Sequence, residues 1–184
     1  MPVTLPLTPE SLPTGTINIV GNAASMLQKQ NGSLIDKHPT VRFNRVEIVD
    51  PQAQGSRWDI LASAEVNTFM KYNNQAPQFH SLIFTPSVSD SVYKSNKIEF
   101  DTTVYNYPRN LANDLTASLE AKPSTGIMIL HYLNTIKHKK VNIFGFDWKA
   151  TPTMYEKRNK GNHNFEKEKS LVLAMIEQNG WNLY

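Results

Sequence analysis

The chain has 184 residues, a formal charge of +3 at pH 7 and no cysteine. Its content of 40% hydrophobic and 19% charged residues is that of an ordinary globular protein, which excludes a disordered or membrane-embedded chain. The missing cysteines exclude a disulfide framework, a thiolate metal site and a cysteine nucleophile.

Short β-branched runs alternate with helical segments along the chain. Residues 1–15, which are rich in proline, are predicted to form an irregular arm, and residues 16–184 a single domain. We expect strands at residues 16–20, 41–44, 58–62, 81–84 and 141–146. We expect helices at residues 23–29, 110–120, 125–136 and 166–178. This alternation predicts an α/β fold with a mostly parallel sheet, in which ligands bind beyond the carboxyl ends of the strands.

The segment K-P-S-T-G-I-M, residues 122–128, places small polar residues directly before an apolar helix. Ser124 or Thr125 can cap the helix, and Gly126 would let a ligand approach the backbone. The N–H groups of the first turn would form an anion site, because they point in the same direction as the helix dipole. The alternative is an ordinary capped helix packed on the core, which is the commoner structure.

Two other polar turns follow predicted strands. The segment V-G-N-A-A-S, residues 20–25, places Gly21, Asn22 and Ser25 after the first strand, and the Asn22 amide would reach a phosphate or ribose. Its spacing is not the G-x-G-x-x-G of NAD-binding proteins. Asn44 ends the second strand, where it would bind a ligand or hold a turn.

The last predicted strand leads into Asp147 and Trp148. Asp147 would hydrogen-bond a ligand hydroxyl or cap the next turn. Trp148 is the aromatic residue best placed to stack on a sugar or base, although aromatic residues near strand ends are more often core. The polar segment 149–162 is the best candidate for a mobile loop over the site.

These segments occur in the order and approximate spacing of the motifs of a known enzyme family. V-G-N with I-D-x-H and V-R-F-N, residues 20–44, resembles the long sialylmotif of the animal-type sialyltransferases. P-S-T-G-I-M with V-N-I-F-G-F, residues 123–146, resembles their short sialylmotif. H-N-F-E-K-E, with His163 five positions before Glu168, resembles their very short motif. Together the motifs cover almost the whole predicted domain.

This resemblance implies a variant glycosyltransferase-A fold with one Rossmann-like sheet flanked by helices. It implies an enzyme that transfers sialic acid from its cytidine monophosphate (CMP) conjugate to a glycan hydroxyl, with inversion and without a metal or other cofactor. The CMP-sugar donor and the glycan acceptor are therefore the expected partners.

The residues and the resemblance together assign individual roles. His163 would be the general base. The residues expected to bind the donor are Asn22, Asn44, Ser124, Thr125, Gly126, Tyr155 and Trp148. The residues expected to support them are Gly21, Ser25, Asp147 and Glu168.

Direct displacement at a sugar carbon agrees with these roles. It needs a base that titrates near neutral pH, which histidine provides. The start of a helix disfavours the imidazolium and would keep His163 neutral, while Glu166 or Glu168 would oppose this or orient the ring. The chain contains no Asp-x-Asp pair, the usual metal ligand of metal-dependent sugar-nucleotide transferases, so metal-free catalysis is expected.

The chain also departs from the family pattern. Between the short and very short motifs, family members have a histidine that helps bind the donor phosphate, whereas this chain reads T-P-T-M-Y-E-K-R, residues 151–158. Tyr155 remains there, and Lys157, Arg158 or Lys160 would replace the positive charge. The chain lacks the family's disulfide, stem and membrane anchor, which favours a cytoplasmic bacterial or viral relative, or a protein trimmed of its anchor.

Three other functions remain open at this point. The donor sugar could be another CMP-activated acid sugar such as Kdo, because the third motif's histidine is missing. A non-catalytic relative that binds nucleotides or glycans would keep the same cradle. Nucleic acid is the least favoured partner, because the basic residues are dispersed rather than clustered in a stripe with aromatic residues.

Overall fold

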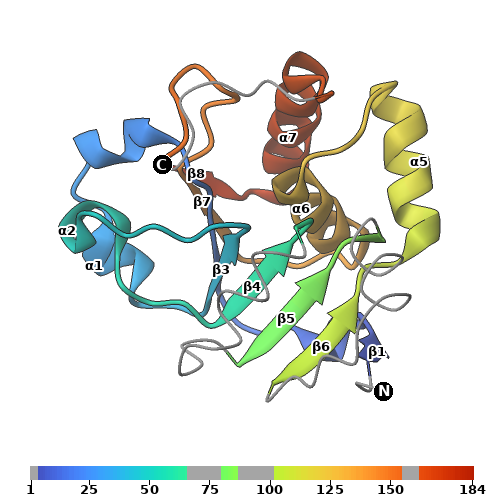
Figure 1. Cartoon of the computed structure of the whole chain (residues 1–184), viewed down its shortest axis with the longest axis horizontal. Coiled ribbons are helices and arrows are strands. Elements are labelled where there is room, and N and C mark those ends of the chain that lie inside the picture. Colours follow the sequence, from blue (N-terminus) through green and yellow to red (C-terminus); the bar gives the residue numbers. More distant parts are fainter. Residues whose placement is uncertain (1–3, 66–79, 87–101, 155–161) are drawn as a thin grey trace.

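A single parallel sheet runs through the part of the chain that the computed structural model describes, namely residues 4–65, 80–86, 102–154 and 162–184 (Figure 1). The strand order is β1-β6-β5-β4-β3-β2-β7-β8, and every neighbouring pair is parallel. The strands are β1 (Thr4–Pro6), β2 (Ile17–Val20), β3 (Thr40–Phe43), β4 (Ile60–Ser63), β5 (Ser81–Phe84), β6 (Thr103–Asn106), β7 (Val141–Phe144) and β8 (Asn182–Leu183). The α/β fold with a parallel sheet is therefore confirmed.

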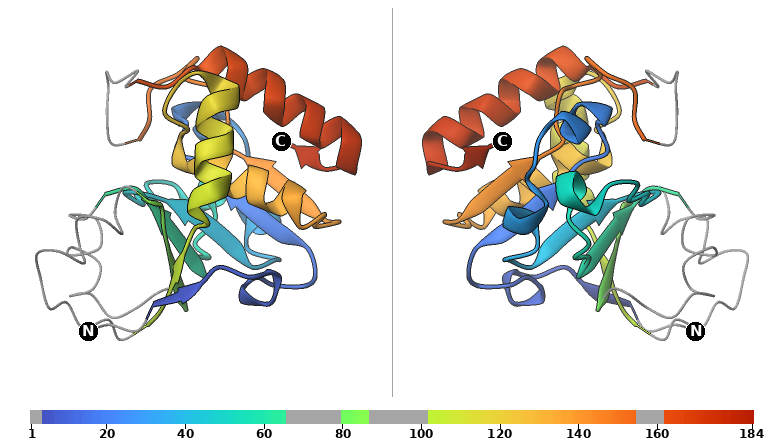
Figure 2. Two further views of the ribbon diagram at one scale, coloured as in Figure 1. Left: turned by 90° about the vertical axis from the view of Figure 1, so that its right-hand side faces the viewer. Right: turned by 90° about the vertical axis from the view of Figure 1, so that its left-hand side faces the viewer.

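Helices cover both faces of this sheet (Figure 2). One face packs against α5 (Arg109–Leu119), α6 (Thr125–Thr135) and α7 (Phe165–Asn179), and the other against η2 (Ala24–Gln28), α1 (Gly32–Ile35) and α2 (Pro51–Gln54). Adjacent residues of one strand face opposite sides of the sheet and pack in two separate hydrophobic clusters. Ile19 belongs to the α6 side, whereas Val20 packs with Met26 and Ile35 on the opposite side. This explains why the central strands are apolar throughout, as buried parallel strands are.

The two helices next to the site are capped by their own side chains. The Ser124 hydroxyl accepts a bond from the Ile127 N–H at the start of α6, and the Asn164 side chain accepts one from the Lys167 N–H at the start of α7. Helix α6 is buried on most of its circumference, whereas α7 buries a stripe. Its residues Glu168, Val172 and Met175 are spaced as one helical face.

Several elements differ from the prediction. Residues 4–6, expected in the irregular arm, form β1 at the edge of the sheet. Proline is tolerated there because only one side of an edge strand pairs with a strand of the described residues. A short 3-10 helix, Pro9–Ser11, follows it, and Leu7 and Leu12 are buried in the main core. Strands β6 and β8, and helices α1 and α2, were not predicted. Residues 23–29 contain the 3-10 helix η2 rather than an α-helix.

Left-handed residues end two strands earlier than predicted. Strand β3 stops at Phe43 because Asn44 has φ 51°, and β7 stops at Phe144 because Gly145 has φ 67°. Asparagine and glycine are the residues that tolerate this conformation most easily. No helix among the described residues is long and apolar enough to cross a membrane.

Candidate active site

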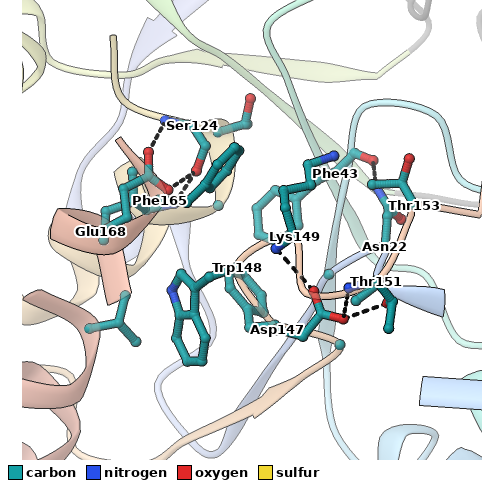
Figure 3. Close-up of a pocket in the computed structure, with 18 of the residues that line it drawn as sticks. Asn22, Phe43, Ser124, Asp147, Trp148, Lys149, Thr151, Thr153, Phe165 and Glu168 are labelled. Carbon is teal, nitrogen blue, oxygen red and sulfur yellow. Dashed lines mark hydrogen bonds between the residues drawn. The ribbon is translucent and has the colours of Figure 1, made fainter. Parts of the chain in front are cut away.

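A cleft lies at the carboxyl ends of β2, β3 and β7 (Figure 3). It encloses about 690 Å³, part of it open to solvent. We call it the inner cleft. The predicted site residues that line it are Gly21, Asn22, Asn44, Ser124, Thr125, Gly126, Asp147, Trp148 and Glu168. The sheet edge predicted from the sequence is therefore the edge at which these residues meet.

A second hollow adjoins the inner cleft and shares Asp147, Trp148, Lys149 and Phe165 with it. We call it the outer hollow. Its remaining lining comes from Ala150, from His163 and Asn164 directly before α7, and from Glu166 and Lys169 on α7. The two spaces therefore adjoin at these four shared residues.

The turns after β2 and β7 are in close contact. A Cβ atom at position 21 would lie 2.3 Å from the Gly145 carbonyl oxygen, so only glycine fits there. The Asp147 carboxylate accepts bonds from the Ser25 hydroxyl (2.9 Å) and from the Thr151 N–H (3.0 Å). Of the two roles considered for Asp147, the structure therefore shows the capping of a turn. Ser25 acts behind the inner cleft, because it does not line it.

The two predicted asparagines are held by backbone groups. Nδ2 of Asn22 donates to the Phe43 carbonyl (2.9 Å). Oδ1 of Asn44 accepts from the Ala64 N–H (3.1 Å), and because an N–H can only donate, the Asn44 oxygen must face it. This leaves Oδ1 of Asn22 and Nδ2 of Asn44 without a bond to any described residue. The pair thus offers an acceptor and a donor to a ligand.

The N-terminus of α6 is engaged by a buried carboxylate. Oε1 of Glu168 accepts from the Ser124 N–H (2.8 Å), and Oε2 accepts from the Ser124 hydroxyl (2.7 Å). Both donors of Ser124 are therefore occupied, and the N–H groups of Thr125 and Gly126 remain available to a ligand. At Gly126 an added Cβ would lie 2.8 Å from the Phe146 ring, so this glycine accommodates an aromatic side chain as well as the helix start.

Burial sets the electrostatics of Glu168. Its side chain is 3% exposed. Desolvation raises the pKa of this carboxyl above its ordinary value, although the bonds from Ser124 and the nearby His163 act in the opposite direction. The carboxyl therefore connects α7 to the start of α6 through its two bonds to Ser124, and we call this contact the α6–α7 joint.

His163 lies beside this joint and lines the outer hollow, not the inner cleft. Its Nδ1 is 2.7 Å from the Lys122 carbonyl oxygen. A carbonyl only accepts, so Nδ1 carries the proton and the neutral ring keeps its lone pair on Nε2. The bond fixes both the tautomer and the orientation of the ring.

Trp148 and Lys149 both have left-handed backbones, with φ 52° and 66°. Such residues cost about 1–3 kcal/mol each and concentrate at functional sites. Trp148 lines both spaces, and Nζ of Lys169 lies 5.6 Å from the centre of its ring. Nζ of Lys149 lies 5.9 Å from the centre of the Phe165 ring.

Lys149, Phe165 and Lys169 were missed by the sequence analysis. For Phe165 and Lys169 a signal was available in the sequence: they are four positions apart at the start of a predicted helix, and such residues share a helical face. Tyr155, Lys157, Arg158 and Lys160 lie outside the described residues, as does residue 161 of the expected loop. Within the described ranges, no group of three His, Asp or Glu side chains is arranged to hold a metal ion.

Comparisons with known proteins identify the fold. Two structures of a mammalian sialyltransferase superpose with TM-scores of 0.67 and 0.68, at 17% and 16% identity. The first is a complex with Gal-beta-1-3GalNAc-ortho-nitrophenol. The matches cover 92% and 96% of this chain, and 68% and 71% of those chains.

The sialyltransferase CstII from Campylobacter jejuni, in complex with the substrate analogue CMP-3FNeuAc, superposes with a TM-score of 0.60 at 11% identity. This match covers 92% of this chain and 80% of that chain. No protein-family model and no curated protein sequence matches the chain. The chain therefore has a sialyltransferase-like fold.

The Glu168 carboxyl gives the protein a pH-dependent stability. Because its pKa is raised in the folded state, folding takes up a proton above the ordinary value of 4.5. The stabilisation is fully present below that value and is lost as the pH rises through the raised pKa. As the pH rises from 4.5 through the raised pKa of Glu168, we expect the free energy of unfolding of the wild type to fall. The free energy of unfolding of Glu168→Gln should fall less over the same interval. Urea denaturation at a series of pH values measures it.

Glu120→Gln is the matched control. Glu120 is fully exposed, and the hydrogen bond from Lys167 lowers its pKa, so its linkage to stability has the opposite sign. Glu120 therefore cannot cause the expected fall, and Glu120→Gln should still show the free energy of unfolding falling with pH as it does in the wild type. An unchanged slope in Glu168→Gln would show that the Glu168 carboxyl is not the group responsible.

Proposed function

We propose that this chain is an inverting, metal-independent sialyltransferase that moves sialic acid from CMP-sialic acid to a glycan hydroxyl, with His163 as the general base. The observation that carries the proposal is the bond from His163 Nδ1 to the Lys122 carbonyl, which leaves Nε2 as a proton acceptor next to the inner cleft. The sialyltransferase-like fold supplies the substrate class. A cytoplasmic location stays part of the proposal.

The inner cleft holds the donor nucleotide in this proposal. Its amide donors without a partner among the described residues are Nδ2 of Asn44 and the N–H groups of Thr125 and Gly126. Amides at the start of a helix stabilise a phosphate, because they donate hydrogen bonds and the helix dipole favours negative charge. Tyr155 and Trp148 stay proposed donor-binding residues, and Trp148 lines the cleft.

The reaction is a single displacement. The acceptor hydroxyl oxygen forms a bond to the anomeric carbon as the bond from that carbon to the phosphate oxygen breaks, and CMP leaves with the electron pair. Nε2 of His163 takes the hydroxyl proton. The Glu168 carboxylate, which interacts with the His163 charge, stabilises the imidazolium that forms. Attack from the face opposite the leaving group gives inversion.

Lys149 compensates for the histidine that the third motif lacks. Its side chain lines both the inner cleft and the outer hollow, and it pairs with no carboxylate of the described residues. Charge develops on the phosphate as CMP leaves, so a cation at the junction of the two spaces stabilises the transition state. The aromatic ring of Phe165 restricts the ammonium group by a cation–π contact.

The two alternative functions, transfer of Kdo and binding without catalysis, would use the same inner cleft. A Kdo transferase would use the same CMP site with a different pocket for the sugar. A non-catalytic relative would bind CMP and transfer nothing. The lone pair on Nε2 of His163 favours an enzyme over that relative, because a binding module does not need a base held in one tautomer.

Removal of the base separates catalysis from binding. We expect His163→Ala to lower kcat by about a hundredfold to ten-thousandfold, the range for loss of a general base, while the dissociation constant of CMP changes by less than about twofold. Transfer from CMP-sialic acid to a panel of glycans, and calorimetric titration with CMP, give the two numbers. His80→Ala is the control, because His80 is exposed at the amino end of β5. Full activity of His163→Ala would refute the base assignment.

The role of Lys149 is tested with two ligands that differ only in the phosphate. We expect Lys149→Gln to weaken CMP binding about fivefold or more and to leave cytidine binding within about twofold, because the ammonium group acts on the phosphate. Glutamine keeps a polar side chain and removes the positive charge. Lys139→Gln, at the amino end of β7, should bind both ligands as the wild type does. An equal loss for cytidine and CMP would contradict this role.

A further inference from the structure

The outer hollow carries a combination of groups that the proposed displacement does not use. Lys169 lines this hollow but not the inner cleft, and its ammonium group lies over the ring of Trp148. Phe165, one helical turn before Lys169 on α7, lines the hollow as well. The outer hollow, which His163 lines, is therefore also lined by two aromatic side chains that it shares with the inner cleft and by Lys169, which it does not share.

The charges around Lys169 leave its ammonium group open to a ligand. The Asp147 carboxylate is taken by the bonds from Ser25, Thr151 and the Lys149 N–H. Glu168 is buried and bonded to Ser124. Glu166 is the remaining carboxylate that lines the hollow, and it is exposed and forms no ion pair with Lys169. A lysine that lies over a tryptophan and lacks a carboxylate partner among the described residues is suited to bind an anion.

We propose that the outer hollow selects an acceptor glycan that carries an acidic group, with Lys169 binding its carboxylate or sulfate and Trp148 or Phe165 contacting its sugar ring. The inference rests on the proposed function, because it places the acceptor beside His163. Sugar rings present apolar faces that pack on aromatic side chains, and the fixed ammonium group then distinguishes an acidic from a neutral sugar.

The anionic groups of the donor are the competing ligands for Lys169. In the proposed function, Lys149 binds the phosphate of the donor. Lys149 lies at the junction with the inner cleft, whereas Lys169 lies only in the outer hollow. Because Lys149 lines the inner cleft and Lys169 does not, we expect the substitution of Lys149 to affect the donor and that of Lys169 to affect the acceptor. This separation makes the proposal testable.

The test uses one glycan in a charged and an uncharged form. Protein saturated with CMP is titrated with 3′-sialyllactose and with its methyl ester, in which an uncharged ester replaces the carboxylate. We expect the wild type to bind the acid about fivefold more tightly than the ester, a ratio suited to one partly exposed ion pair, and this preference to shrink at high salt. Lys169→Gln should reduce the ratio to about one, and Glu166→Gln should increase it.

Lys139→Gln is the matched control and should keep the preference of the wild type. Equal binding of the acid and the ester by the wild type, no binding of either sugar, or an equal loss of preference in Lys139→Gln would overturn the inference. A Lys169→Gln protein that lost affinity for CMP itself would assign Lys169 to the donor and overturn it too. Failure of the wild type to bind CMP would instead remove the proposed function, so the two failures are distinguishable.

Discussion

The two hydrogen bonds between Ser124 and the buried carboxylate of Glu168 hold the site together. They join the start of α6, which borders the inner cleft, to the first turn of α7. His163 lies directly before Asn164, the N-cap residue of α7. The bond from His163 to the Lys122 carbonyl belongs to the same joint, because Lys122 lies two residues before Ser124. A carboxylate with 3% exposure is tolerated only with such partners. The position of the proposed base is therefore set by the same contacts that pack the two helices.

The parallel sheet explains why polar groups gather at one edge. The turns after β2, β3 and β7 leave neighbouring strands at their carboxyl ends, so Asn22, Asn44 and Asp147 lie around one cleft. Two of these groups keep amide atoms for a ligand, whereas Asp147 holds the turns together. The positive charge comes from outside the strands, from Lys149 at the junction and Lys169 on α7. In the two proposals, the lysine for the donor and the lysine for the acceptor therefore come from different elements.

The sequence pattern predicted the parts of the fold that depend on local residues. Apolar runs identified the central strands and the long helices. The polar residue after one strand identified Asn44, and the polar residue before an apolar helix identified Ser124. Short edge strands such as β1 and β8 were missed because their pairing depends on distant strands rather than on their own residues. The bond from Ser124 to Glu168 spans 44 residues, and no local pattern reports it. Lys169 was missed for the same reason, because its significance depends on which side chain of another element it meets.

The most direct test of the proposed function is the nucleotide selectivity of the inner cleft. Calorimetric titration of the wild-type protein with CMP, UMP and AMP, with a metal chelator present throughout, measures it. The proposed function predicts that CMP binds most tightly and that the chelator does not weaken its binding, since the groups proposed to bind the phosphate are amides and Lys149 of the inner cleft. Tighter binding of UMP or AMP, or binding that disappears with the chelator, would contradict a metal-independent CMP-sugar transferase.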